Sequence, residues 1–193
     1  IQRLVGSEMC IRDSANVING FSGNNMFTYK YSHDSGINLT ASYINASDAV
    51  TDVSYSDYGI TYTGMDGLTL GYGEGDVENV TGTKSAESTM FAKYAMGSFT
   101  VGIQTSEKDN DGSSDVESTG IGISYQVNDD LSVSYGTNTI ETVGSTDQDS
   151  VAVGVSYTMG SLGISFSMNQ VDNIAHSATN DREAYQLGLS FAF

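Results

Sequence analysis

The sequence has no proline, no tryptophan and a single cysteine among its 193 residues. One cysteine cannot form an internal disulfide, and no run approaches eighteen apolar residues, which excludes a transmembrane helix. Basic residues are also scarce: seven Lys+Arg stand against 24 Asp+Glu, for a formal net charge of −17. Phosphate binding needs Lys and Arg, so this balance argues against a nucleic acid as partner.

The residues that are abundant favour strands and turns, with 22 Gly, 12 Tyr and 7 Phe. From residue 25 onward, apolar and polar residues alternate. In "MFTYKY", Phe27, Tyr29 and Tyr31 share one parity, while Thr28 and Lys30 share the other. Successive side chains of a strand point to opposite faces, so this alternation predicts half-apolar strands. Eleven strands are expected, near 26–31, 37–43, 53–63, 68–74, 88–96, 99–105, 119–127, 131–137, 150–158, 162–169 and 184–193.

The connections between these strands alternate in length. Short ones are rich in Gly, Asp, Asn and Ser, as tight turns require. They are expected at 32–36, 64–67, 96–98, 128–130 and 159–161. Long ones are expected at 46–52, 75–87, 106–118, 138–149 and 170–183. A tyrosine precedes each short turn: Tyr31, Tyr62, Tyr94, Tyr125 and Tyr157. This repeat predicts hairpins with all short turns at one end of a sheet and all long loops at the other.

The two strand faces differ sharply in size and polarity. One carries large apolar residues such as Val133 and Val153, and the other carries Ser, Thr and Gly, as at Ser134 and Ser156. A soluble closed barrel fills its inside with bulky side chains, which this small polar face cannot do. A sandwich would bury the apolar face against a second sheet, and is the alternative. We therefore expect an all-β, antiparallel transmembrane β-barrel with aromatic residues at both strand ends and its apolar face against lipid.

Three stretches carry a family resemblance: "NNMFTYKYSHDSGINLTASY" (24–43), "YAMGSFTVGIQ" (94–104) and the terminal "YQLGLSFAF". They resemble the trimeric general porins of Gram-negative bacteria, of the alphaproteobacterial type. The resemblance implies an integral outer-membrane protein, a homotrimer, and passive diffusion of small hydrophilic solutes and ions with no enzymatic activity and no cofactor. It also implies a sixteen-stranded barrel of which these are the last eleven strands, with the end of an inward constriction loop near 15–25.

Two segments are expected on this basis. Residues 15–193 form the C-terminal part of a porin barrel. Residues 1–14, "IQRLVGSEMCIRDS", share neither the alternation nor the Gly and Tyr content, and resemble adapter-derived sequence. We expect this segment to be non-native.

Lys30, Lys93 and Asp57 are the candidate pore-lining residues, because they fall on the small polar face. Lys30 and Lys93 are the only bases expected on strands. In porins that this sequence resembles, such basic residues oppose acids on the constriction loop. A solvated lysine without a special role is the alternative. Most acids fall in the expected long loops, against Lys84, Lys108 and Arg182, which predicts a preference for cations.

The sequence carries only an incomplete metal-binding pattern and no legible catalytic one. Residues 106–118 have calcium-loop spacing, but the twelfth position, Ser118, is not an acid, so an EF-hand is excluded. A loosely held divalent ion at Asp109, Asp111 and Asp115 is the alternative to a solvated loop. No Ser–His–acid arrangement is legible near His33 or in the last long loop. An adhesin or autotransporter barrel, or a barrel enzyme, remains the alternative function.

Overall fold

The computed structural model describes residues 26–45, 53–79, 82 and 84–191. The expected non-native segment 1–14, the constriction-loop region 15–25 and the terminal Phe193 lie outside these residues. The described part contains eleven strands and one short 3-10 helix. In chain order they are β1 (Met26–Ser32), β2 (Ile37–Ile44), β3 (Val53–Met65), β4 (Leu68–Asn79), β5 (Lys84–Met96), β6 (Phe99–Asn110), β7 (Val116–Gln126), β8 (Leu131–Thr142), β9 (Gln148–Met159), β10 (Leu162–Asp172), η1 (Ile174–His176) and β11 (Arg182–Phe191).

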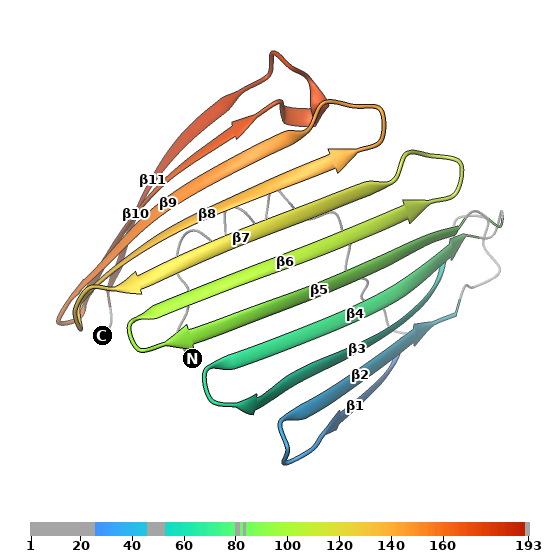
Figure 1. Ribbon diagram of the computed structural model, residues 1–193, viewed down its shortest axis with the longest axis horizontal. Coiled ribbons are helices and arrows are strands. Elements are labelled where there is room, and N and C mark those ends of the chain that lie inside the picture. The colour runs from blue at the N-terminus through green and yellow to red at the C-terminus, as the bar shows by residue number, and fades with distance from the viewer. Residues whose placement is uncertain (1–25, 46–52, 80–81, 83, 192–193) are drawn as a thin grey trace.

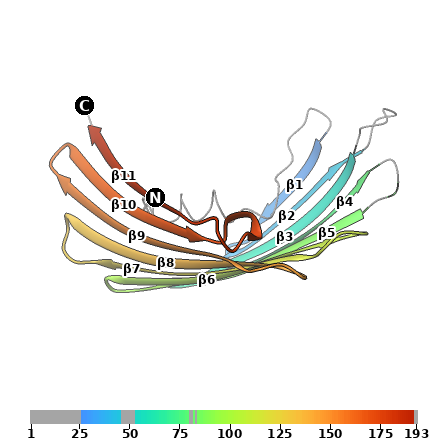
Figure 2. The same cartoon turned by 90° about the horizontal axis from the view of Figure 1, so that it is seen from above.

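The eleven strands form one antiparallel sheet in sequential order, from β1 at one edge to β11 at the other. Figure 1 shows the strands side by side, with the long connections at one end of the sheet and the tight turns at the other. Seen from above, the sheet is strongly curved (Figure 2). Within the described residues β1 and β11 do not pair with each other, so the sheet is an open, curved wall. The all-β antiparallel prediction is confirmed.

Several strands extend further toward the long-loop end than the apolar alternation indicates. β4 continues to Asn79 and β5 begins at Lys84, so most of the expected connection 75–87 is strand. Backbone pairing continues there, as in the pairs Glu74↔Ser88 and Val77↔Ser85. The expected boundaries were wrong because the side chains become polar on both faces before the hydrogen-bonded ladder ends.

Glycines close the tight turns where the backbone enters the left-handed region. Gly67, between β3 and β4, has a φ of 74°. Its carbonyl oxygen accepts a hydrogen bond from the amide of Ala95 at 2.8 Å, and a Cβ at Gly67 would collide with the carbonyl of Ala95. This turn therefore requires glycine both for its conformation and for its close approach to the next hairpin.

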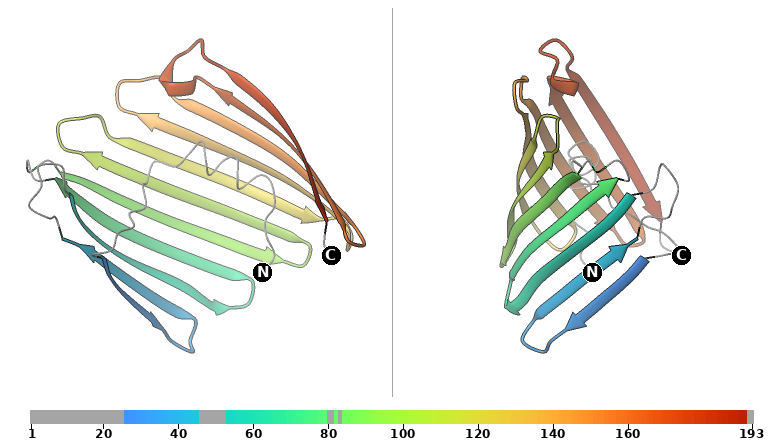
Figure 3. Two further views of the ribbon diagram at one scale, coloured as in Figure 1. Left: turned by 180° about the vertical axis from the view of Figure 1, so that it is seen from behind. Right: turned by 90° about the vertical axis from the view of Figure 1, so that its right-hand side faces the viewer.

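The register assigns every strand residue to one of two faces. Val133 lies opposite Val155, while the adjacent Ser134 lies opposite Gly154. Most of the large apolar side chains share one face and remain in contact with the surroundings: Ile121 is 55% exposed and Leu187 is 68% exposed. Among the described residues the buried apolar ones are only Ile140 and Ala152. No second sheet covers either face among the described strands (Figure 3).

None of the helices in the described residues is long and apolar enough to cross a membrane. The exposed apolar face is larger than the apolar patches that soluble proteins leave in contact with water.

Aromatic residues lie on that apolar face next to the short turns and again further along the strands. The tyrosines that precede the short turns occupy it, as the pairs Leu68↔Tyr94 and Leu131↔Tyr157 indicate. The rings of Phe99 and Tyr125 have centroids 4.4 Å apart. Toward the long loops, the same face carries the rings expected there: Tyr43, Tyr72, Tyr135 and Phe166. This is the two-girdle arrangement of a sheet that crosses a bilayer, because amphipathic rings favour the membrane interface.

Candidate functional site

The polar face, hereafter the inner wall, is the concave side of the sheet. The helix η1 contacts it: the amide of Ala175 donates to Oε1 of Gln148 at 3.0 Å, and Nε2 of His176 lies 3.0 Å from Oγ1 of Thr142. Figure 2 shows η1 on the concave side. The inner wall consists mainly of Ser, Thr, Gly and Asn, and the opposite, convex side is hereafter the outer face.

The three residues predicted to line the pore all lie on the inner wall. Lys30 of β1 pairs with Thr40, Asp57 of β3 pairs with Ser42 and Gly75, and Lys93 of β5 pairs with Thr69 and Gly102. The two lysines are exposed and Asp57 is half-buried. The structure places them on three separate strands, so they form a scattered set and not a cluster.

The structure adds an ion pair that the sequence analysis missed. Glu87 of β5 lies opposite Lys108 of β6, and Oε1 of Glu87 is 2.8 Å from Nζ of Lys108. Glu87 is buried, with 3% of its side chain exposed, and Lys108 is 23% exposed. The expectation that Lys30 and Lys93 are the only bases on strands is therefore wrong.

Glu87 and Lys108 were missed because both were assigned to long loops. A usable signal was present, since Glu87 has the same parity as Thr89, Phe91 and Lys93. Extending the alternation six residues back from Lys93 would have placed Glu87 on the inner wall.

The ion pair belongs to a polar row that crosses four strands. Asp57 lies opposite Gly75, which lies opposite Glu87, which lies opposite Lys108. A Cβ at Gly75 would be 3.0 Å from the hydroxyl oxygen of Tyr55, so the Tyr55 side chain lies over that glycine. Glycine here leaves room for the Tyr55 hydroxyl over the position that separates Asp57 from Glu87 in the row.

The structure does not gather Asp109, Asp111 and Asp115 into a metal site. Oδ2 of Asp111 accepts a hydrogen bond from the amide of Lys84 at 3.3 Å, and Oδ1 of Asp115 accepts one from the amide of Asn110 at 3.2 Å. Across the described ranges, no group of three or more His, Cys, Asp or Glu residues is arranged to hold a metal ion. The two aspartates act as local supports of the β6–β7 loop.

Ten acids lie toward the long-loop ends of the strands, and nine of them, all but Glu74, were expected in long loops. Their register puts them on the outer face, where we call them the outer acids. They are Glu74, Asp76, Glu78, Glu107, Asp109, Glu117, Glu141, Asp149, Asp172 and Glu183. β4, β5 and β6 have 12 to 13 residues, more than the roughly nine to eleven that cross a bilayer, so their ends project beyond the apolar band.

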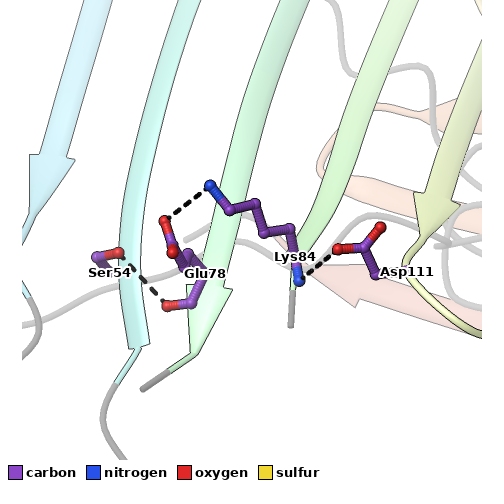
Figure 4. A network of polar contacts seen from close by, with 4 residues as sticks. All are labelled: Ser54, Glu78, Lys84 and Asp111. Atoms are coloured by element: carbon purple, nitrogen blue, oxygen red, sulfur yellow. Dashed lines mark hydrogen bonds and ion pairs between the residues drawn. The ribbon is translucent and has the colours of Figure 1, made fainter. Parts of the chain in front are cut away.

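Polar contacts tie these projecting ends together. Nζ of Lys84 is 3.2 Å from Oε2 of Glu78, and the hydroxyl of Ser54 donates to the carbonyl oxygen of Glu78 at 3.4 Å. The amide of Lys84 also binds Asp111, so one network joins β3, β4, β5 and the loop after β6 (Figure 4).

The boundary of the apolar band is marked by tyrosines whose hydroxyls turn toward an acid. The hydroxyls of Tyr58 and Tyr72 both donate to Oε2 of Glu74, at 2.5 and 2.7 Å. Tyr185 makes the same kind of contact with Glu183 at 2.6 Å. Each tyrosine thus keeps its ring in the apolar band and its hydroxyl at the polar edge, as residues of a membrane interface do.

Several solved structures superpose on the curved sheet of this chain. The anion-selective porin from Comamonas acidovorans superposes with a TM-score of 0.73 at 16% identity, covering 88% of this chain and 60% of that one. A porin refined at 1.8 Å resolution gives 0.73 at 15% identity, covering 91% and 66%. OmpT, an outer membrane protein of Vibrio cholerae, gives 0.62 at 16% identity, covering 86% and 63%. At such identities the likeness concerns the fold.

The chain spans about three fifths to two thirds of the length of these structures. Among curated proteins, none matches the chain by sequence. The sequence profile of the Gram-negative porins matches residues 5–193, nearly the whole chain. This chain therefore belongs to the Gram-negative porin family, whose members are β-barrels of the outer membrane.

Proposed function

We propose that the natural protein containing this chain is a passive channel for small hydrophilic solutes and ions. The observation that carries the proposal is the opposition of the two faces: exposed apolar side chains outside, and small polar side chains on the concave inner wall. Ser, Thr and Gly leave space in front of the wall, and the hydroxyls of Ser and Thr offer hydrogen bonds to water. A curved wall of this kind suits a water-filled passage and not a packed interior.

The channel requires more strands than the eleven that the structure describes. β1 and β11 have no partner on their outward edges among the described residues, and unpaired strand edges are not tolerated in lipid. We propose that further strands close the barrel and that sixteen is their total. The chain covers only 60 to 66% of the two porins and the outer membrane protein described above, which supports this.

We further propose a homotrimer with no enzymatic activity. A trimer form is recorded for OmpT of Vibrio cholerae, with a TM-score of 0.60 at 16% identity. The trimer is testable by cross-linking the folded protein in outer-membrane fragments, where a band at three times the protomer mass is expected and a protomer band alone would contradict it.

Liposome swelling tests the channel itself. The full-length natural protein is reconstituted into liposomes, which are then diluted into uncharged sugars of increasing size. We expect swelling rates that fall steadily with sugar size, because diffusion through a water-filled pore is limited by its width. Liposomes that swell no faster than protein-free ones would overturn the proposal.

A further inference from the structure

The charges of the described strands are divided unequally between the two faces. The outer face carries all ten outer acids and one base, Lys84. The inner wall carries two acids, Asp57 and Glu87. Its bases are Lys30, Lys93, Lys108 and Arg182. The protein is strongly acidic as a whole, yet bases outnumber acids on the described strands of its inner wall.

The excess of bases on the inner wall is larger when only the exposed, unpaired charges are counted. Lys108 is neutralised by Glu87 at 2.8 Å. Lys30, Lys93 and Arg182 are exposed and form no ion pair with a described residue. Asp57 is half-buried. A solute moving along the wall thus meets three exposed cationic groups and one partly covered acid.

The outer acids are poorly placed to offset the positive charge of the inner wall. They lie on the opposite side of the sheet and project toward its polar edge, where electrolyte surrounds them. At physiological salt the Debye length is about 8 Å, so charges across the wall are screened more strongly than those that line the passage. Charges that line a cleft with low-dielectric walls dominate the local ion concentration.

We infer that the inner wall attracts small anions and that the outer acids do not set the ion preference of the channel. This inference rests on the proposed channel function and names the class of solute that the wall favours: small inorganic and carboxylate anions. The acid count predicts a preference for cations, whereas the positions of the charges predict the opposite at the wall.

The test compares charge removal on the two faces. The full-length natural protein is reconstituted in planar bilayers, and reversal potential is measured under a potassium chloride gradient near physiological salt, where charges more than a Debye length from the ion path are screened. One variant, Lys30→Gln with Lys93→Gln, removes two inner-wall bases. The matched control, Glu107→Gln with Glu117→Gln, removes two outer acids that lie opposite each other on β6 and β7.

We expect the lysine variant to lower the permeability ratio of chloride to potassium by roughly two-fold or more per lysine, as a unit charge several ångströms from the ion path does in water. The control should leave the ratio unchanged. A conducting channel in which the lysine variant has no effect, or in which the control shifts the ratio as much, would overturn the inference alone. A wild-type protein that conducts no ions would overturn the channel function as well.

Discussion

Glu87 and Lys108 form a 2.8 Å ion pair across β5 and β6, with Glu87 almost wholly removed from solvent. Replacing Lys108 by Met should leave a buried carboxylate without its partner. Breaking a buried pair in this way costs about 3–5 kcal/mol of unfolding free energy. Urea-induced unfolding of the folded full-length protein measures the change.

The matched control for this variant is Lys93→Met, which removes an exposed lysine of the same wall on the neighbouring strand β5. It should change stability little. Combining Lys108→Met with Glu87→Gln should recover part of the loss, since no buried charge then remains. Equal effects of the two lysine substitutions would contradict a stabilising pair.

The assignment of faces predicts opposite responses at neighbouring positions. Val133→Arg places a charge on the outer face and should destabilise the folded protein by about 2–4 kcal/mol if that site lies at mid-membrane. Ser134→Arg points into the passage, opposite Gly154, and should fold normally while lowering single-channel conductance. Val153→Arg and Ser156→Arg form a second pair on β9. Equal tolerance at both parities would refute the face assignment.

Close packing on the inner wall predicts a steric coupling between β4 and β5. Gly71 lies opposite Phe91, and a Cβ at Gly71 would collide with the Phe91 ring. Gly71→Val should therefore destabilise the protein by about 1–3 kcal/mol, as overpacking does. In the Phe91→Ala background the same substitution should cost much less. A double-mutant cycle in urea measures the coupling, and additive effects would show that the ring does not occupy that space.

The orientation in the membrane can be tested by labelling. Ser113 lies in the loop between β6 and β7, and Asp129 lies in the tight turn between β7 and β8, at the opposite end of the sheet. In outer-membrane barrels the longer loops face outward and the short turns face the periplasm. A cysteine at Ser113 should react with a membrane-impermeant reagent on intact cells, and one at Asp129 should react only after lysis. The reverse pattern would invert the orientation.

The strands, their faces and their order could be predicted from the sequence because alternation is a local signal. Phe27, Tyr29 and Tyr31 identify an outer face without any knowledge of neighbouring strands, and the short Gly-containing turns dictate antiparallel pairing. The same parity put Lys30, Lys93 and Asp57 on the inner wall. Where the alternation stops, this signal is lost, and so the strands β4 through β11 were predicted too short at their long-loop ends.

The tertiary structure alone decided which charges meet and which face they occupy. Whether Glu87 contacts Lys108, and whether Glu107 and Glu117 oppose each other on the outer face, depends on the register between strands that are joined by loops of polar residues. No apolar pattern marks those ends, because both sides of a projecting strand end are wetted. The sequence by itself determined a two-faced membrane wall, and cross-strand pairing determined that most of its acids lie outside and most of its bases inside.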